Sequence, residues 1–161
     1  MPRRTAPEGP GVKVVAVNRR ARHDYEILES FEAGLSLLGS EVKSLRAGRA
    51  DLKDGYGTIE AGRAWLIGVH ISPYQFAREG GHEPERARPM LMHRGEIERI
   101  RGKLDQKGLT LIPLRLYFKE GKAKVEVDLA RGKAKYDKRE TLKRRQAERE
   151  MQRAMRHKSI D

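Results

Sequence analysis

The chain has 161 residues, a formal net charge of +12 at pH 7 and no cysteine. The lack of cysteine excludes disulfides, thiolate metal sites and cysteine nucleophiles. No apolar run approaches the ~20 residues of a membrane span, and the N-terminus has no signal-peptide stretch, so we expect a cytoplasmic protein without a membrane partner.

The chain divides by composition into three predicted parts. Residues 1–11 contain three prolines and two glycines and predict a disordered leader. Residues 12–130 hold most of the large apolar side chains, which predicts one domain with a modest core. Residues 131–161 hold twelve Lys/Arg against five Asp/Glu and very little that could form a core, which predicts a basic C-terminal tail.

Alternating apolar and polar residues predict three hairpins along the central part. Tyr25–Phe31 would turn at Ala33-Gly34 into Leu35–Leu38. Tyr56–Glu60 would pair with Ala64–Ile71 across Ala61-Gly62, with Trp65, Ile67, Val69 and Ile71 on one face. Leu109–Phe118 would pair with Lys122–Ala130 across Glu120-Gly121.

In the third hairpin, the alternation of the second strand predicts which side chains face the core and which face water. Val125, Val127 and Leu129 would point inward, and Lys124, Glu126 and Asp128 outward. Pro113 cannot donate to a strand ladder, so it should lie at an edge or a bulge.

Two helices are predicted between the strands. Ser40 can cap a short helix that runs through Arg46 and ends at Gly48. His93–Lys107 predicts a longer helix with Ile97, Ile100 and Leu104 on one stripe and Gly108 as its stop. The segment between Pro73 and Pro89 predicts a polar loop. The fold class is mainly β: a six-stranded antiparallel barrel of the OB type with small flanking helices.

The tail has helical potential despite its composition. On a helix, Arg145, Arg149, Arg153 and His157 form one row at i, i+4 spacing, and Ala147, Met151, Ala154 and Met155 form an apolar stripe. Like charges at this spacing oppose an isolated helix, whereas phosphates along the row would remove the repulsion. We therefore expect the tail to be disordered when free and helical on a polyanion.

No catalytic or metal-binding constellation stands out, and no cofactor is expected. The five histidines show no HExxH-type spacing. Glu41, Asp51 and Asp54 are the candidate Mg²⁺ carboxylates of an alternative function, a basic RNA-processing nuclease.

Basic clusters indicate nucleic-acid binding more directly. They comprise Arg19, Arg20 and Arg22; Arg86 and Arg88; and Lys119, Lys122 and Lys124. Small barrels combine such a rim with side chains that stack on bases, and the candidates here are Tyr25, Tyr56, Tyr74 and Leu91. Because aromatic residues are few, we expect recognition of a folded RNA's shape.

Six motifs together resemble the SmpB family, the SsrA-binding partners of tmRNA in bacterial trans-translation. The resemblance runs from about Val15 to Arg156, and the motifs are Asn18–Tyr25, Phe31–Gly34, Gly39–Gly48, His70–Tyr74, Pro113–Lys119 and Gly132–Glu140. It implies an OB-type barrel without an active site. Such a barrel binds the tRNA-like domain of tmRNA and delivers it to ribosomes that have stalled without a stop codon.

The resemblance also implies roles for particular residues. Glu32, Leu91 and Lys124 would belong to the RNA-contacting surface. The tail motif would act in the ribosomal decoding centre and the empty mRNA channel, with Tyr136 stacking there; its residues are Gly132, Lys133, Lys135, Tyr136, Asp137, Lys138 and Arg139.

The sequence thus predicts an RNA-binding adaptor that is not an enzyme and is a monomer when free. Its expected partners are the tRNA-like domain of tmRNA and the small-subunit rRNA of the ribosome. Two alternatives remain open at this point, the Mg²⁺-dependent nuclease and a constitutive ribosomal protein.

Overall fold

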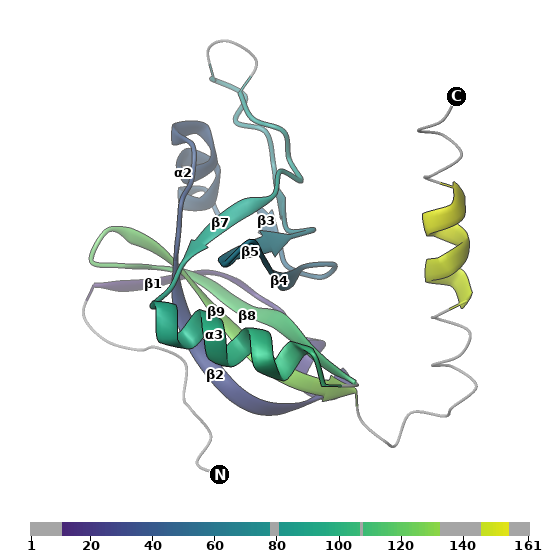
Figure 1. The fold of residues 1–161 in the computed structure, drawn as a ribbon. Coiled ribbons are helices and arrows are strands. Elements are labelled where there is room, and N and C mark those ends of the chain that lie inside the picture. Colours follow the sequence, from purple (N-terminus) through teal and green to yellow (C-terminus); the bar gives the residue numbers. More distant parts are fainter. Residues whose placement is uncertain (1–10, 78–80, 107, 133–145, 155–161) are drawn as a thin grey trace. The chain divides into compact units, whose positions relative to one another are not determined.

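The computed structural model describes residues 11–77, 81–106, 108–132 and 146–154 (Figure 1). Most of the predicted leader and of the tail motif lies outside these residues. By its internal contacts the chain forms two compact units, Met1–Arg131 and Gly132–Asp161, which are described separately below.

The first unit is mainly β and antiparallel. Its seven-stranded sheet has the order β1-β8-β4-β5-β7-β2-β9, and β9 also pairs with β8. The strands are β1 (Val12–Val17), β2 (Tyr25–Leu35), β4 (Tyr56–Glu60), β5 (Arg63–Ile67), β7 (Arg88–Leu91), β8 (Leu109–Lys119) and β9 (Lys122–Gly132). A separate two-stranded sheet joins β3 (Ala50–Asp51) to β6 (His70–Ile71).

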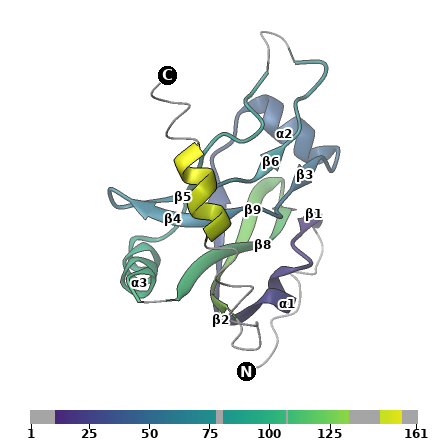
Figure 2. The ribbon, with the colours of Figure 1, turned by 90° about the vertical axis from the view of Figure 1, so that its right-hand side faces the viewer.

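Three short helices accompany the strands: α1 (Ala21–Asp24), α2 (Gly39–Arg46) and α3 (Arg94–Leu104) (Figure 2). The longest, α3, begins after His93 and buries Ile100, with Ile97 and Leu104 packed against the core, as the apolar stripe predicted. Within the described residues, none of the helices has the length and hydropathy needed to cross a membrane.

Two of the predicted hairpins are confirmed. Glu60 pairs with Arg63 and Lys119 with Lys122, so each hairpin has a two-residue turn. Both residues of each turn have positive φ, 51° and 74° at Ala61-Gly62 and 52° and 78° at Glu120-Gly121. This geometry matches the right-handed twist of the flanking strands. Pro113 lies at a register shift of the β8–β9 pair, which confirms its prediction too.

The first predicted hairpin is wrong, because Ala33-Gly34 does not turn. β2 continues through both residues, and Gly34 pairs with Leu91 of β7. A Cβ on Gly34 would lie 3.3 Å from the Cβ of Leu91. The glycine therefore permits a close strand approach instead of a turn. The Pro73–Pro89 loop is also shorter than predicted, since β7 begins at Arg88.

The predicted face of the fifth strand is also wrong. The buried residues of this region are Ala64, Leu66, Val69 and Ile71, whereas Trp65 and Ile67 are only half-buried. Gly68, at φ 74°, ends β5 and shifts the alternation by one residue. The sequence pattern assumed an unbroken strand, and one left-handed residue invalidates that assumption.

The core explains why β9 is buried on both faces. Val125, Val127 and Leu129 lie in the main cluster, as predicted. A second, smaller cluster of Ala21, Ile112, Leu114 and Ala130 lies on the other side, with Tyr25 packed against it. Glu126 and Asp128 are consequently buried, at 7% and 0% exposure, although their outward direction had predicted contact with water.

Candidate nucleic-acid interface

Three predicted RNA-contact residues meet around one buried tyrosine at the tip of the β8–β9 hairpin. The hydroxyl of Tyr117 donates to Oε2 of Glu32 at 2.5 Å. Nζ of Lys119 lies 3.5 Å from Oε1 of the same carboxylate. Lys124 is directly opposite Tyr117 in the β8–β9 register and therefore shares its face. We call Glu32, Leu91, Tyr117, Lys119 and Lys124 the hairpin face.

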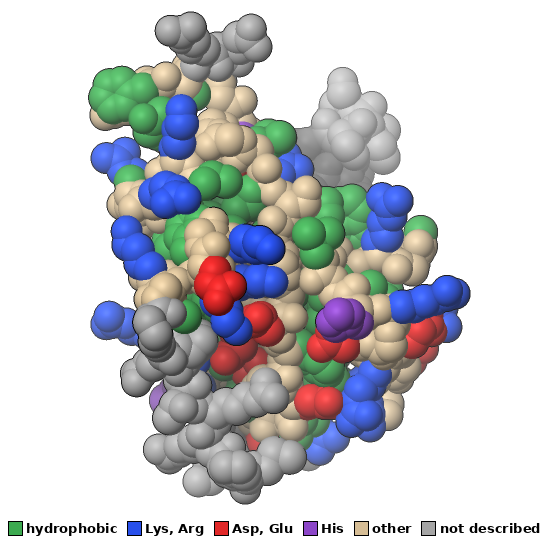
Figure 3. Space-filling view, turned by 90° about the vertical axis from the view of Figure 1, so that its left-hand side faces the viewer, with side chains coloured by type: hydrophobic (Ala, Val, Ile, Leu, Met, Phe, Trp, Pro, Cys, Tyr) green, Lys and Arg blue, Asp and Glu red, His purple; other side chains and the backbone are tan. Residues whose placement is uncertain are grey.

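Leu91 joins this surface through its pairing with Gly34. Along β2, Phe31, Ala33 and Leu35 point into the core, so Glu32 and Gly34 point the other way. Leu91, opposite Gly34, is 63% exposed. An apolar side chain this exposed, beside a carboxylate and two lysines, is a group available to a base. The β8–β9 turn projects toward the side of the molecule that Figure 3 shows.

The charges of this face are coupled. The hydrogen bond from Tyr117 lowers the pKa of Glu32, and Lys119 and Lys124 act in the same direction, against the effect of burial. Burial raises the pKa of Tyr117 far above its usual range, and the Glu32 carboxylate adds to this. At neutral pH the face therefore holds a fixed carboxylate, a neutral phenol and two ammonium groups.

Lys122 is exposed next to this face, but the basic cluster of Arg19, Arg20 and Arg22 is not part of it. β1 runs from Val12, opposite Lys119, to Val17, opposite Arg115, and the N–H of Asn18 donates to the carbonyl of Leu114. Arg19, Arg20 and Arg22 therefore follow beside the middle of β8, and all three are exposed. These arginines and the lysines of the hairpin face thus form two separate basic groups along β8.

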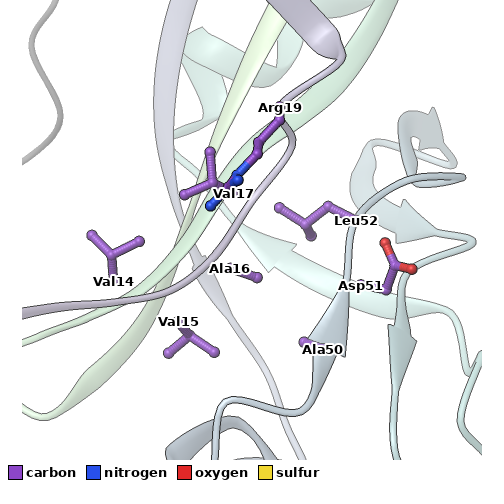
Figure 4. A pocket seen from close by; sticks show the side chains of 8 residues that line it. All are labelled: Val14, Val15, Ala16, Val17, Arg19, Ala50, Asp51 and Leu52. Atoms are coloured by element: carbon purple, nitrogen blue, oxygen red, sulfur yellow. The ribbon is translucent and has the colours of Figure 1, made fainter.

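Arg19 also lines a shallow pocket of about 340 Å³ between β1 and β3 (Figure 4). β1 supplies its valines, and Asp51 and Leu52 lie across from them. This pocket contains no aromatic ring, so it offers an arginine and a carboxylate but no stacking surface.

Arg86 and Arg88 do not form a basic RNA-binding cluster, because both are paired with Glu41. Arg88 is fully buried and donates through Nε to Oε2 of Glu41 at 2.5 Å. Arg86 donates to Oε1 at 2.6 Å. Arg88 also donates to the carbonyls of Val69 and Pro84. These arginines hold α2 and the 72–87 segment together.

The same contacts count against the nuclease alternative. Glu41 has no exposed surface, and its lowered pKa reflects the bonds from Arg86, Leu38 N–H and Arg88, which outweigh burial. Asp51 accepts from the backbone N–H of Lys53. Within the described ranges, no group of three His, Asp or Glu residues could hold a metal ion.

Glu41, and not Ser40, caps the N-terminus of α2. The backbone N–H of Leu38 donates to Oε1 of Glu41, whereas the hydroxyl of Ser40 bonds Nδ1 of His82 at 2.9 Å. The predicted Ser40 cap is therefore wrong. The helix does end near Gly48, at φ 74°, as predicted.

Only part of the predicted tail site can be described. Gly132 is the last residue of β9, and residues 146–154 are helical with exposed side chains. Arg149, Met151 and Arg153 lie on this helix, and Met151 is 59% exposed. The other tail residues, Lys133, Lys135, Tyr136, Asp137, Lys138, Arg139 and Arg145, lie outside the described residues.

Sequence reasoning missed Tyr117 as a member of the candidate site. Its position on β8 gave no signal, because it lies between apolar neighbours in a strand that is buried on both sides. No local pattern indicates its bond to Glu32, because the two residues are 85 positions apart in the chain.

Known proteins resemble the chain over nearly its whole length. The family model described as "SmpB protein" matches residues 15–157. An SsrA-binding protein of Gloeothece citriformis is 58% identical over 89% of this chain and 93% of its own. One of Desulforudis audaxviator is 56% identical over 91% and 96%.

A solved structure is similar as well. A chain from "tmRNA-SmpB: a journey to the center of the bacterial ribosome" is 50% identical, with a TM-score of 0.65, and the match covers 80% of this chain and 88% of the other. Together with the family model and the relatives, it fixes the family. The chain belongs to the SmpB family.

Proposed function

We propose that this protein is the tmRNA-binding adaptor of trans-translation. It binds the tRNA-like domain of tmRNA and delivers it to stalled ribosomes in the cytoplasm, without an active site of its own. The observation that carries the proposal is the hairpin face, where an exposed apolar side chain, two lysines and an oriented carboxylate lie together on a family member.

We further propose that the strands form an OB-type barrel. Pairings run from β8 through β4, β5, β7, β2 and β9, and β9 pairs with β8 again. Such a return of the pairing order to its first strand is what a closed barrel requires. Its rigid wall would hold the hairpin face in a fixed shape for a folded RNA.

Each residue of the hairpin face has a chemical role in this proposal. Lys119, Lys122 and Lys124 would neutralise phosphates, and Leu91 would pack on a base. Glu32 keeps free lone pairs beside its bond from Tyr117 and would accept from a base amino group. Arg19, Arg20 and Arg22, which follow β1 beside the middle of β8, would contact a separate stretch of phosphates.

The tail would act on the ribosome. Gly132 would permit the bend out of the barrel, and the 133–139 segment with Tyr136 would enter the decoding centre. Arg145, Arg149 and Arg153 would then face rRNA phosphates along the mRNA channel, with Met151 against its wall. The helix at 146–154 supports this assignment, since it puts Arg149 and Arg153 one turn apart.

The function is tested by sequencing the RNA that co-purifies with the full-length protein. We expect one dominant tmRNA species. The purified protein should also shift labelled tRNA-like RNA in the presence of Mg²⁺ without cutting it. Cleavage would favour a nuclease, and full-stoichiometry recovery with salt-washed ribosomes lacking tmRNA would favour a constitutive ribosomal protein.

A further inference from the structure

The loop between β6 and β7 carries aromatic rings beside α2, outside the hairpin face. Phe76, in the segment between β6 and β7, is 72% exposed, which is the largest exposure of any large apolar side chain among the described residues. Its ring meets the half-buried ring of Tyr74 edge-on at 5.6 Å between centroids. Nζ of Lys43, from α2, lies 5.4 Å from the Tyr74 centroid. We call Lys43, Tyr74 and Phe76 the ring platform.

The platform is held by contacts on both sides in the chain. Before it, Ser72 donates its N–H to the carbonyl of Arg49, and the hydroxyl of Ser44 donates to the carbonyl of Ser72 at 2.7 Å. After it, buried His82 bonds both Ser40 and the carbonyl of Ile71 at 2.9 Å. Next to Phe76, the N–H of Ala77 donates to the carbonyl of Tyr74 at 3.0 Å, so Phe76 lies within a hydrogen-bonded turn.

The charge beside the platform is positive. Lys43 and Arg46 of α2 are exposed, although the guanidinium carbon of Arg46 also lies 5.0 Å from the centroid of the Phe118 ring, and exposed Arg49 follows three residues later. The carboxylate of α2, Glu41, is buried between Arg86 and Arg88 and so does not offset them at the surface. Glu83 and Glu85 are exposed later in the loop, where Glu85 lies 3.9 Å from His70. Figure 3 shows hydrophobic side chains among Lys and Arg toward the end of the molecule that carries α2.

We propose that the ring platform is a second contact with the bound RNA, where an unpaired base stacks on Phe76 and Tyr74 while Lys43 and Arg46 hold the adjacent phosphates. Exposed rings flanked by cations are the chemistry that binds unstacked bases. The inference rests on the proposed tmRNA-binding function. The ring platform would contact the same RNA as the hairpin face, because Glu32 of β2 and the start of α2 are only seven residues apart. Seven residues span about 25 Å at most.

The test measures the affinity of the full-length protein for a transcript of the tRNA-like domain. Phe76→Ala should weaken binding by about tenfold with an unchanged salt dependence, since stacking carries no charge. Lys43→Gln should weaken it and lower the log–log salt slope by about 0.7–0.9. Phe76→Trp should keep the affinity, and Lys53→Gln, an exposed lysine outside the platform, should change it little. Unchanged unfolding transitions would show that each variant is folded.

Chemical probing of the RNA identifies the contact. Wild-type protein should protect at least one unpaired base that becomes reactive with Phe76→Ala but stays protected with a Glu32→Ala protein at saturation. Wild-type affinity for the transcript with Phe76→Ala would overturn the inference and leave the proposed function standing. A defect seen only on ribosomes would also overturn it, because the platform would then meet rRNA or a ribosomal protein. Failure of the wild-type protein to bind would instead overturn the proposed function.

Discussion

The bond between Tyr117 and Glu32 is the residue-scale feature that most shapes the hairpin face. The buried phenol of Tyr117 donates to Oε2 of Glu32, and Lys119 lies 3.5 Å from Oε1, so the carboxylate is held in one orientation. Tyr117→Phe should weaken binding to the tRNA-like domain by roughly three- to tenfold while barely changing binding to random RNA, because one charge-assisted hydrogen bond is lost. Filter binding measures both, with Tyr56→Phe as the matched control on an exposed tyrosine.

Glu32→Ala distinguishes a specific contact from simple repulsion. If the carboxylate accepts from a base, its loss should weaken binding at least as much as Tyr117→Phe, and the double variant should add little further. Tighter binding would mean that the carboxylate only repelled phosphates. Since the bond from Tyr117 lowers the pKa of Glu32, the ionised form, and with it the affinity, should persist to a lower pH than an ordinary glutamate would allow.

Asp128 is a second residue with a testable charge state. Burial raises its pKa to about 7, and Glu126 adds to the effect, against Ser30, Arg22 and Arg115. An unfolded aspartate ionises near pH 4, so the folded state holds the proton more tightly and stability falls from about pH 4 to about pH 7, then stays level. Asp128→Asn should remove that slope and stabilise the protein at pH 8 by up to about 4 kcal/mol, since each pKa unit corresponds to about 1.4 kcal/mol. Urea unfolding across this pH range would measure it, and an unchanged slope would contradict the assignment.

At the scale of elements, Glu41 joins α2 to the 72–87 segment and β7. Removing one member of a buried ion pair leaves the other uncompensated, so Glu41→Leu should destabilise the protein by about 3–5 kcal/mol. Arg88→Met in the same chain should restore part of this loss, since no buried charge would then face an apolar partner. Thermal unfolding of the single and double variants tests it. Equal stability of the two would show that the carbonyls of Val69 and Pro84 are sufficient to accommodate the Arg88 charge without Glu41.

The helix at 146–154 is the other element with a predicted role. Met151→Pro should abolish peptide tagging on stalled ribosomes and leave tmRNA affinity unchanged, because proline costs about 3 kcal/mol inside a helix. Met151→Leu, which keeps helix propensity and apolar surface, is the matched control. Normal tagging by the proline variant would show that the charge of the tail is sufficient without a helix.

At the scale of the whole molecule, the two compact units predict a division of labour. β9 extends through Gly132, so a truncation that preserves the sheet must remove residues 133–161 only. This shortened protein should unfold cooperatively and bind the tRNA-like domain with nearly unchanged affinity, yet fail to support tagging. Circular dichroism would monitor the unfolding. If the shortened protein no longer unfolds cooperatively, the tail is needed for the fold.

Local sequence patterns were sufficient to predict those structural features that depend only on residues close together in the chain. The turns at Ala61-Gly62 and Glu120-Gly121, the α3 stripe and the bulge at Pro113 were predicted correctly, because backbone sterics and periodicity decide them. The family motifs likewise lie in the sequence itself. They are therefore sufficient to identify the family and to nominate Glu32, Leu91 and Lys124.

Tertiary contacts decided the rest. Gly34 had the local appearance of a turn residue, yet its role depends on Leu91, which is 57 residues later in the chain. Arg88 had the appearance of an RNA-binding cation, yet a buried glutamate from α2 pairs with it. Asp128 was predicted to point outward, but α1 and β2 cover that face, and Tyr117 belongs to the hairpin face only through its bond to Glu32. Pairing across distant segments fixes burial and charge, and no local pattern records which segments will meet.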